Sequence, residues 1–244
     1  MTGRPAHPAG ERAVSILYPR RCPVCGGITE PPGALICAKC RPLLREVREP
    51  TCRKCGKEIE DEREEYCADC RRHRKSFAGG VSLFNYNAAA SESMSEVKYK
   101  NRREYLDFYA DEAVRRLGGR LLAMHADALV PVPVHPSRRR KRGFNQAEIL
   151  ACRIGERLEI PVVSGFLQRT RKTAPQKELG PEARLKNLEQ AFTTADPAPA
   201  AFRTVILVDD IYTTGSTVEA CTRVLMRAGV KKVFFFTVFI GHGM

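Results

Sequence analysis

The sequence predicts an α/β domain with a mostly parallel sheet flanked by helices, preceded by a small cysteine-rich module. From Phe77 onwards, apolar runs alternate with amphipathic stretches, which is typical of α/β domains. The run VFFFTVFI (233–240) is apolar on both faces, as in a buried strand of a parallel sheet. Eight of the ten Cys fall before residue 71, all in CxxC pairs. We therefore expect a flexible tail with a short anchor helix over 1–20, the cysteine module over 21–75 and the α/β domain over 76–244.

Composition excludes several classes of protein. The chain has 244 residues and 43% apolar content, enough to bury a core. It contains no apolar run near the ~18–20 residues that cross a bilayer, and no signal-like apolar segment near its start. We therefore expect a cytoplasmic protein without membrane insertion. A net charge of +13 favours anionic partners such as nucleic acid, nucleotides or sugar phosphates.

The cysteine pairs form a duplicated unit. Each pair starts 15 residues after the previous one, and Gly follows Cys25 and Cys55 whereas Arg follows Cys40 and Cys70, so the pattern repeats every 30 residues. A CxxC turn presents two thiolates on one side of a tight loop, and two such turns complete a tetrahedral zinc site. We expect two structural zinc ions, one per unit, held by Cys22, Cys25, Cys37 and Cys40 and by Cys52, Cys55, Cys67 and Cys70. Cross-braced pairing, redox-active CxxC and an iron–sulfur cluster are the alternatives.

The zinc module contributes little to the positive charge. Eight thiolates and two Zn²⁺ would leave residues 1–80 with a charge of about +1. Residues 81–244 carry 25 Lys and Arg against 17 Asp and Glu. The remaining basic character therefore belongs to the α/β domain.

Within that domain the elements follow from periodicity and capping residues. A helix should open at Asn145, with Glu148 three residues on, and another at Ser216, with Glu219 at the third position, ending at Gly229. A basic loop precedes the first of these helices and a long polar stretch, 169–190, follows the strand after it. The expected strands are 81–86, 127–132, 161–167, 204–208 and 233–240, and the expected helices are a long zone from 102 to 124, then 145–158 and 216–228.

The most informative stretch is VILVDDIYTTGST, residues 205–217. A buried strand ends in two acids, and a Thr/Gly/Ser turn then leads into a helix. Such a turn offers backbone amides, hydroxyls and the positive end of a helix dipole to a phosphate. The adjacent carboxylates suit sugar hydroxyls or a hydrated Mg²⁺. The ligand should therefore have a hydroxylated part and a phosphate part.

This stretch resembles the motif with which type I phosphoribosyltransferases bind 5-phosphoribosyl 1-pyrophosphate (PRPP). The resemblance implies that Asp209 and Asp210 are the catalytic acids that hold the ribose hydroxyls, with magnesium bound together with PRPP. It also implies a type I phosphoribosyltransferase-like fold. The residues that would cradle the 5-phosphate are Thr213, Thr214, Gly215, Ser216 and Thr217.

Further segments resemble the ComF family. They are the entry Tyr18-Pro19-Arg20-Arg21-Cys22, VPVPVHPSRRRKRGFNQAE (130–148) and RTRKTAPQKELGPEARLKNLEQAF (169–192). Together with the double zinc ribbon and the PRPP motif they cover nearly the whole chain. The resemblance implies a role in DNA uptake during natural transformation, with single-stranded DNA and a competence helicase as partners.

The loops supply the remaining candidates. The pyrophosphate loop would run from Pro133 to Arg138, and Lys98 could approach from the segment before it. The stretch 169–185 lies where type I enzymes carry a lid, in which Thr173 and Gln176 could close over pyrophosphate. A basic run of five residues, from Arg138 to Arg142, lies at the end of this loop. It would contact the pyrophosphate or face nucleic acid or solvent, and the candidates for nucleic-acid binding are Arg139, Arg140, Lys141 and Arg142.

Three functions are compatible with these features. The first is a PRPP-binding, phosphoribosyltransferase-like protein of DNA uptake that also binds nucleic acid. The second is a metabolic phosphoribosyltransferase that transfers the 5-phosphoribosyl group to a base or an amine. The third is a zinc-ribbon nucleic-acid adaptor with a vestigial PRPP site. The zinc ribbons and basic loops favour the first and third, and the intact acid pair with TTGST favours the first and second.

Overall fold

A four-stranded parallel sheet forms the centre of the computed structural model, which describes residues 19–170, 187–195 and 202–241. The strand order is β1-β6-β5-β2, and every pair of neighbours runs parallel. The α/β prediction with a mostly parallel sheet is therefore confirmed. The strands are β1 (Gly79–Asn85), β2 (Ala128–Pro131), β5 (Thr204–Tyr212) and β6 (Lys232–Ile240).

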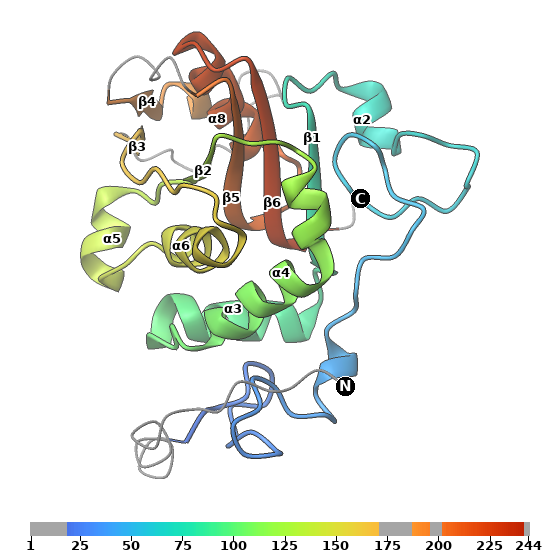
Figure 1. Ribbon diagram of the computed structural model, residues 1–244, viewed down its shortest axis with the longest axis vertical. Helices are drawn as coiled ribbons and strands as arrows, with labels where there is room; N and C mark the ends of the chain where they lie inside the picture. The colour runs from blue at the N-terminus through green and yellow to red at the C-terminus, as the bar shows by residue number, and fades with distance from the viewer. Residues whose placement is uncertain (1–18, 171–186, 196–201, 242–244) are drawn as a thin grey trace.

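Each face of the sheet is covered by a different set of elements. Alternate residues of a strand point to opposite faces, so Ile206 and Val208 of β5 pack into one apolar cluster whereas Val205 and Leu207 pack into the other. Figure 1 shows α4 and α6 in front of the sheet and α8 behind it. The bounds of the covering helices are α3 (Ala88–Lys100), α4 (Tyr105–Leu122), α6 (Gln146–Leu158) and α8 (Ser216–Arg227).

The helical zone expected from 102 to 124 is only the second half of a helix pair. Helix α3 precedes it, capped by the Asn87 side chain, which accepts a hydrogen bond from the Ala90 amide at 2.9 Å. The chain turns at Asn101, whose φ is 60°, and α4 then begins. The sequence AAASESMSEVKYK of α3 has few large apolar side chains, which is why periodicity did not reveal it.

Two other predictions are corrected. The strand expected at 161–167 is only a bridge between Val162 and Leu129, and β3 (Leu167–Arg169) instead pairs antiparallel with β4 (Phe192–Thr194) in a separate two-stranded sheet. The expected basic loop is a short helix, α5 (Pro136–Arg142), which ends at Gly143 with φ 82°. A proline at its first position and a glycine after its last are favourable helix ends.

The two cysteine units lie at different places on the α/β domain (Figure 1). The first includes the 3-10 turn η1 (Arg41–Leu43), and the Arg41 guanidinium donates to both Glu112 oxygens in α4, at 2.9 and 2.7 Å. The second includes α2 (Ala68–Arg72) and lies against β1, where a Cβ on Gly56 would come within 2.6 Å of the Gly80 carbonyl oxygen.

The tail and anchor helix expected over 1–20 fall almost entirely outside the described residues. Among the residues that are described, no helix combines the length and the apolar character needed to cross a bilayer.

Candidate functional site

The eight paired cysteines form two compact groups. Cys22, Cys25, Cys37 and Cys40 make one group, and Cys52, Cys55, Cys67 and Cys70 make the other; within each group the ligand atoms all lie within 4.8 Å of one another. Four thiolates at this separation fit a tetrahedral zinc ion with no position left for a substrate. The grouping is sequential rather than cross-braced, and the role of the metal is structural.

The glycine after each first knuckle has a geometric reason. Gly26 and Gly56 have φ values of 69° and 73°, a conformation that other residues rarely adopt. Each donates its amide to the carbonyl of the first cysteine of its pair, Cys22 at 2.9 Å and Cys52 at 2.8 Å. The two repeats therefore fold into the same turn.

The acid pair lies inside β5 rather than after it. The strand was expected to end at residue 208, but it continues to Tyr212, pairing with β6 through Asp209↔Thr237 and Tyr212↔Ile240. On its other edge β2 ends at Pro131, opposite Val208, so the edge of β5 beyond that point faces the start of α6. Successive residues of a strand point to opposite faces, and the two carboxylates therefore lie in different surroundings.

Asp210 is buried and held by two side chains. Lys98, from α3, forms an ion pair with its Oδ2, and the Gln146 amide, from the first turn of α6, donates to Oδ1 at 2.8 Å. Asp210 is only 5% exposed, so it depends on these partners. Burial alone would raise the pKa of Asp210, but Lys98 and the Gln146 hydrogen bond outweigh that effect and hold its pKa below the ordinary value.

Asp209 is the more open of the two acids. It is half-buried, and its Oδ1 accepts a hydrogen bond from the Asp210 amide at 2.8 Å. Burial and the neighbouring charge of Asp210 raise the pKa of Asp209. A bound cation or hydroxyl donor would offset that repulsion, so Asp209 is suited to contact a ligand directly.

The Thr/Gly/Ser turn connects β5 to α8 through Gly215. Gly215 has a φ of 74° and is the N-cap of α8, which has no side-chain cap. The predicted capping box of Ser216 and Glu219 is therefore wrong: the Ser216 hydroxyl lies 2.9 Å from that of Thr214, and Glu219 accepts hydrogen bonds from Ser76 instead. Among the residues that the structure describes, no side chain caps the amides at the start of this 12-residue helix, and such free amides are what an anion-binding turn offers.

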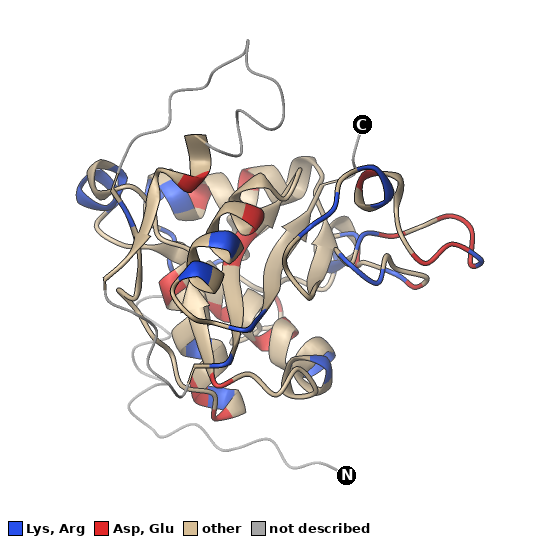
Figure 2. Cartoon of the chain, turned by 90° about the horizontal axis from the view of Figure 1, so that it is seen from above, with Lys and Arg blue, Asp and Glu red and all other residues tan. Residues whose placement is uncertain are grey.

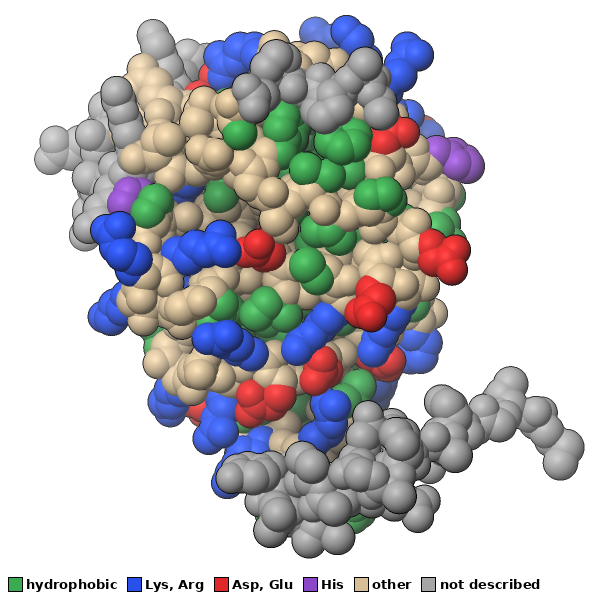
Figure 3. All heavy atoms as spheres, turned by 60° about the vertical axis from the view of Figure 1, so that its left-hand side comes forward, with side chains coloured by type: hydrophobic (Ala, Val, Ile, Leu, Met, Phe, Trp, Pro, Cys, Tyr) green, Lys and Arg blue, Asp and Glu red, His purple; other side chains and the backbone are tan. Residues whose placement is uncertain are grey.

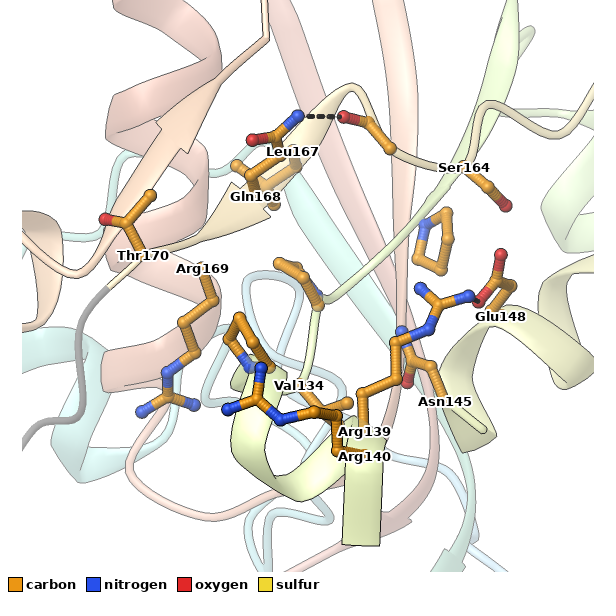
Figure 4. A pocket seen from close by; sticks show the side chains of 14 residues that line it. Val134, Arg139, Arg140, Asn145, Glu148, Ser164, Leu167, Gln168, Arg169 and Thr170 are labelled. Carbon is orange, nitrogen blue, oxygen red and sulfur yellow. Dashed lines mark hydrogen bonds and ion pairs between the residues drawn. The ribbon is translucent and has the colours of Figure 1, made fainter. Parts of the chain in front are cut away.

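A cavity of about 560 Å³ lies beside the end of β2, between α5, the start of α6 and β3. Figure 4 shows Arg139, Arg140 and Arg169 around it, with Gln168 and Leu167 of β3 on the opposite side. Arg139 forms an ion pair with Glu148 at 3.1 Å. Burial lowers the pKa of Arg169, and the nearby Arg138 lowers it further. The arrangement suits an anionic ligand.

Of the other basic residues in this run, two face solvent and one lies near Asp210. Arg138 and Lys141 are exposed, whereas Arg142 donates to Gln146 and lies over the Tyr99 ring at 5.9 Å. Figure 2 shows the basic residues of α5 at one edge of the molecule and the acidic loop of the second cysteine unit at the other. On the side of the molecule seen in Figure 3, Lys and Arg are interspersed with Asp and Glu. The five successive basic residues from Arg138 to Arg142 thus lie together in α5.

The structure brings some of the predicted site residues together. Lys98 and Asp210 are in contact, and Asp209 lies next to them in β5, upstream of the Thr213–Thr217 turn. Thr173 and Gln176 lie outside the described residues. Sequence reasoning missed Gln146, although a buried polar residue directly after a helix cap could have signalled a role.

Comparison with known proteins identifies the parts of the chain. Residues 13–71 match the double zinc ribbon domain family, and residues 140–242 match the phosphoribosyl transferase domain family. The chain is 35% identical to Competence protein F of Haemophilus influenzae over 44% of its length and 47% of that protein. It is 31% identical to DNA utilization protein YhgH of Escherichia coli over 63% of its length and 68% of that protein.

Two further similarities are more distant. Competence protein ComFC of Bacillus subtilis is 26% identical over 61% of this chain and 58% of that protein. A purine phosphoribosyltransferase from Pyrococcus horikoshii Ot3 superposes with a TM-score of 0.34 and 18% identity, over 55% of this chain and 82% of that one. The alignment with Competence protein F spans about half the length of that relative.

Fold, cysteine groups and family matches together define a phosphoribosyltransferase-like protein that carries a double zinc ribbon. Within that class, the chain is similar in sequence to YhgH and to the competence proteins. The chain belongs to the ComF family.

Proposed function

We propose that this protein binds PRPP together with magnesium at the end of β5 and acts in the handling of DNA during uptake. The observation that carries the proposal is the pairing of Asp210 with Lys98 and Gln146 directly before an uncapped helix N-terminus. The names of the relatives, Competence protein F and DNA utilization protein, support the cellular role.

Different residues would bind different parts of PRPP. The turn amides and hydroxyls from Thr213 to Thr217 would bind the 5-phosphate, since the helix dipole of α8 favours a negative charge there. Asp209 would accept hydrogen bonds from the ribose hydroxyls, and Asp210, neutralised by Lys98, would hold the edge of β5 in place. Magnesium bound together with the ligand would supply positive charge at the pyrophosphate, and the Arg138 guanidinium, at the start of α5, would add to it.

Calorimetry with PRPP and Mg²⁺ tests the proposal. The wild type should bind and Asp209→Ala/Asp210→Ala should not, because the change removes both the acceptor for the ribose hydroxyls, Asp209, and the carboxylate that holds the edge of β5 in place, Asp210. A matched control is Glu60→Ala/Asp61→Ala, which removes two adjacent exposed acids from the second ribbon and should leave affinity unchanged. Binding by the acid-pair variant equal to that of the wild type would show that the motif has been misassigned.

A second candidate function is phosphoribosyl transfer to a base or an amine, and the cavity beside β2 favours it because an acceptor could be held there. PRPP consumption with a panel of nucleobases distinguishes turnover from binding alone. A nucleic-acid adaptor with a vestigial site would bind single-stranded DNA but neither bind nor consume PRPP.

A further inference from the structure

The second zinc ribbon reaches the phosphate turn directly. Lys75, just after the last cysteine of this ribbon, donates its ammonium to the Thr214 carbonyl oxygen at 3.3 Å. The same ammonium forms an ion pair at 3.3 Å with Asp69, which lies between Cys67 and Cys70. The Lys75 side chain is only 10% exposed, so its ammonium depends on these two partners rather than on solvent. One lysine thus bridges the metal loop and the turn.

Neighbouring contacts also join the segment that follows the second ribbon to the phosphate turn and to α8. Ser76 donates its amide and its hydroxyl to the two Glu219 oxygens in the first turn of α8, at 2.8 and 2.7 Å. Phe77 packs edge-on against Tyr212, with ring centroids 6.4 Å apart, and Cys52 and Cys55 belong to the same apolar cluster. The turn is therefore held from the side of the second ribbon.

The first ribbon differs at the equivalent positions. In the 30-residue repeat, Lys39 occupies the position of Asp69, and Arg45 occupies that of Lys75. The Arg45 side chain is 63% exposed and forms an ion pair with Glu58 at 3.5 Å. The Asp69–Lys75 ion pair, which contacts the phosphate turn, is thus a feature of the second ribbon and is not repeated in the first.

We propose that Lys75 is a positioning residue for the phosphate turn, and that it couples metal binding in the second ribbon to the affinity of the turn for a phosphate. Zinc fixes the Cys67–Cys70 loop, that loop fixes Asp69, and Asp69 directs Lys75 to the Thr214 carbonyl. Without this anchor the turn would sample other conformations, and the amides that bind phosphate would no longer converge. The affinity part of the inference rests on the proposed PRPP site.

Amide hydrogen exchange and calorimetry with PRPP and Mg²⁺ test it on the full chain loaded with zinc. Lys75→Met should speed exchange at residues 213–216 and weaken PRPP binding roughly tenfold, because a charged hydrogen bond is removed. Lys75→Arg should restore most of both, since its guanidinium can reach the same acceptors. Arg45→Met, the equivalent change in the first ribbon, should alter neither measurement.

The outcomes separate the two proposals. If the wild type does not bind PRPP, the proposed function fails, and exchange at the turn alone decides the role of Lys75. Exchange at 213–216 that is the same in Lys75→Met and the wild type would overturn the inference. If Lys75→Met does not fold or loses zinc, Asp69→Asn takes its place: faster exchange at the turn with both zinc ions retained supports the coupling, and unchanged exchange refutes it.

Discussion

At the scale of single residues, the phosphate turn depends on one glycine. Gly215 combines a φ of 74° with a close approach to Tyr212, because a Cβ there would lie 2.6 Å from Cζ of the tyrosine. Tyr212 cannot move away, since its ring stacks on Phe235 with centroids 4.8 Å apart. Neither backbone nor neighbour can accommodate a larger residue.

Gly215→Ala should therefore destabilise the protein by about 2 kcal/mol or more, from the positive φ and the overlap with Tyr212. Chemical denaturation measures this change. The control is Gly119→Ala in α4, where a Cβ meets no atom within 4 Å. That change should be neutral or stabilise by up to ~1 kcal/mol, because alanine favours helix. Equal effects of the two substitutions would contradict this account of the turn.

At the scale of elements, the first ribbon is attached to α4 through a buried carboxylate. Glu112 is 3% exposed and accepts hydrogen bonds from Arg41 and, at 2.6 Å, from Arg115. Burial opposes its charge, but the hydrogen bonds from the two arginines outweigh burial and lower the pKa of Glu112. The ion pair therefore contributes stability only while Glu112 is ionised.

Glu112→Gln should cost about 2 kcal/mol near neutral pH, because both guanidinium groups lose a charged partner. Since the pKa of Glu112 is lowered by folding, its contribution is full above the unfolded value of about 4.3 and is lost as pH falls through the folded value. The difference between wild type and variant, followed by denaturation against pH, should thus shrink in acid. Asp111→Asn, at an exposed ion pair with Arg157, should change stability by less than ~1 kcal/mol.

Helix α5 concentrates the basic residues that we expect to bind DNA. Arg139→Ala/Arg140→Ala/Lys141→Ala should weaken single-stranded DNA binding and flatten its salt dependence, by up to ~0.7 in the log–log slope for each phosphate that is no longer neutralised. PRPP affinity should fall much less, because these side chains belong to a different segment from the phosphate turn. Binding titrations at several salt concentrations measure both effects.

A control for this variant lies at the opposite end of the sheet. Arg227→Ala/Lys231→Ala/Lys232→Ala removes the same charge from exposed residues near the start of β6 and should leave DNA binding nearly unchanged. If DNA and PRPP binding fall together in the α5 variant, the basic run belongs to the nucleotide site.

At the scale of the whole molecule, the two zinc ribbons belong to two different apolar clusters. Cys22, Cys37 and Cys40 pack with α4 and α6, whereas Cys52 and Cys55 pack with α8 and the other face of the sheet. Each metal therefore stabilises a different side of the α/β domain.

Protein purified without added zinc should contain two zinc ions per chain by metal analysis, since each cysteine group is complete within its own repeat. Removal of zinc with a strong chelator should lower the thermal stability of the whole protein, because metal binding contributes directly to folding. One zinc per chain, or bound iron with visible absorbance, would contradict the prediction.

The sequence alone determined the features that depend on local spacing. The 30-residue repeat of CxxC pairs predicted the zinc ribbons, and the acid pair followed by TTGST predicted a turn that suits phosphate. Such patterns can be recognised in the sequence because the residues that act together are close in the chain. The strands that are buried on both faces were predicted for the same reason, as continuous apolar runs.

Only the tertiary structure decided which distant residues meet. That Gln146 and Lys98 hold Asp210, and that Lys75 of the second ribbon supports Thr214, follows from strand order and helix packing rather than from any local pattern. Secondary structure also changed where packing overruled the pattern: β5 continues through both acids because β6 pairs with it as far as Tyr212. Contacts between residues 139 positions apart, as in Lys75 and Thr214, arise only when the whole chain has folded, because that is when their backbones come within hydrogen-bond distance.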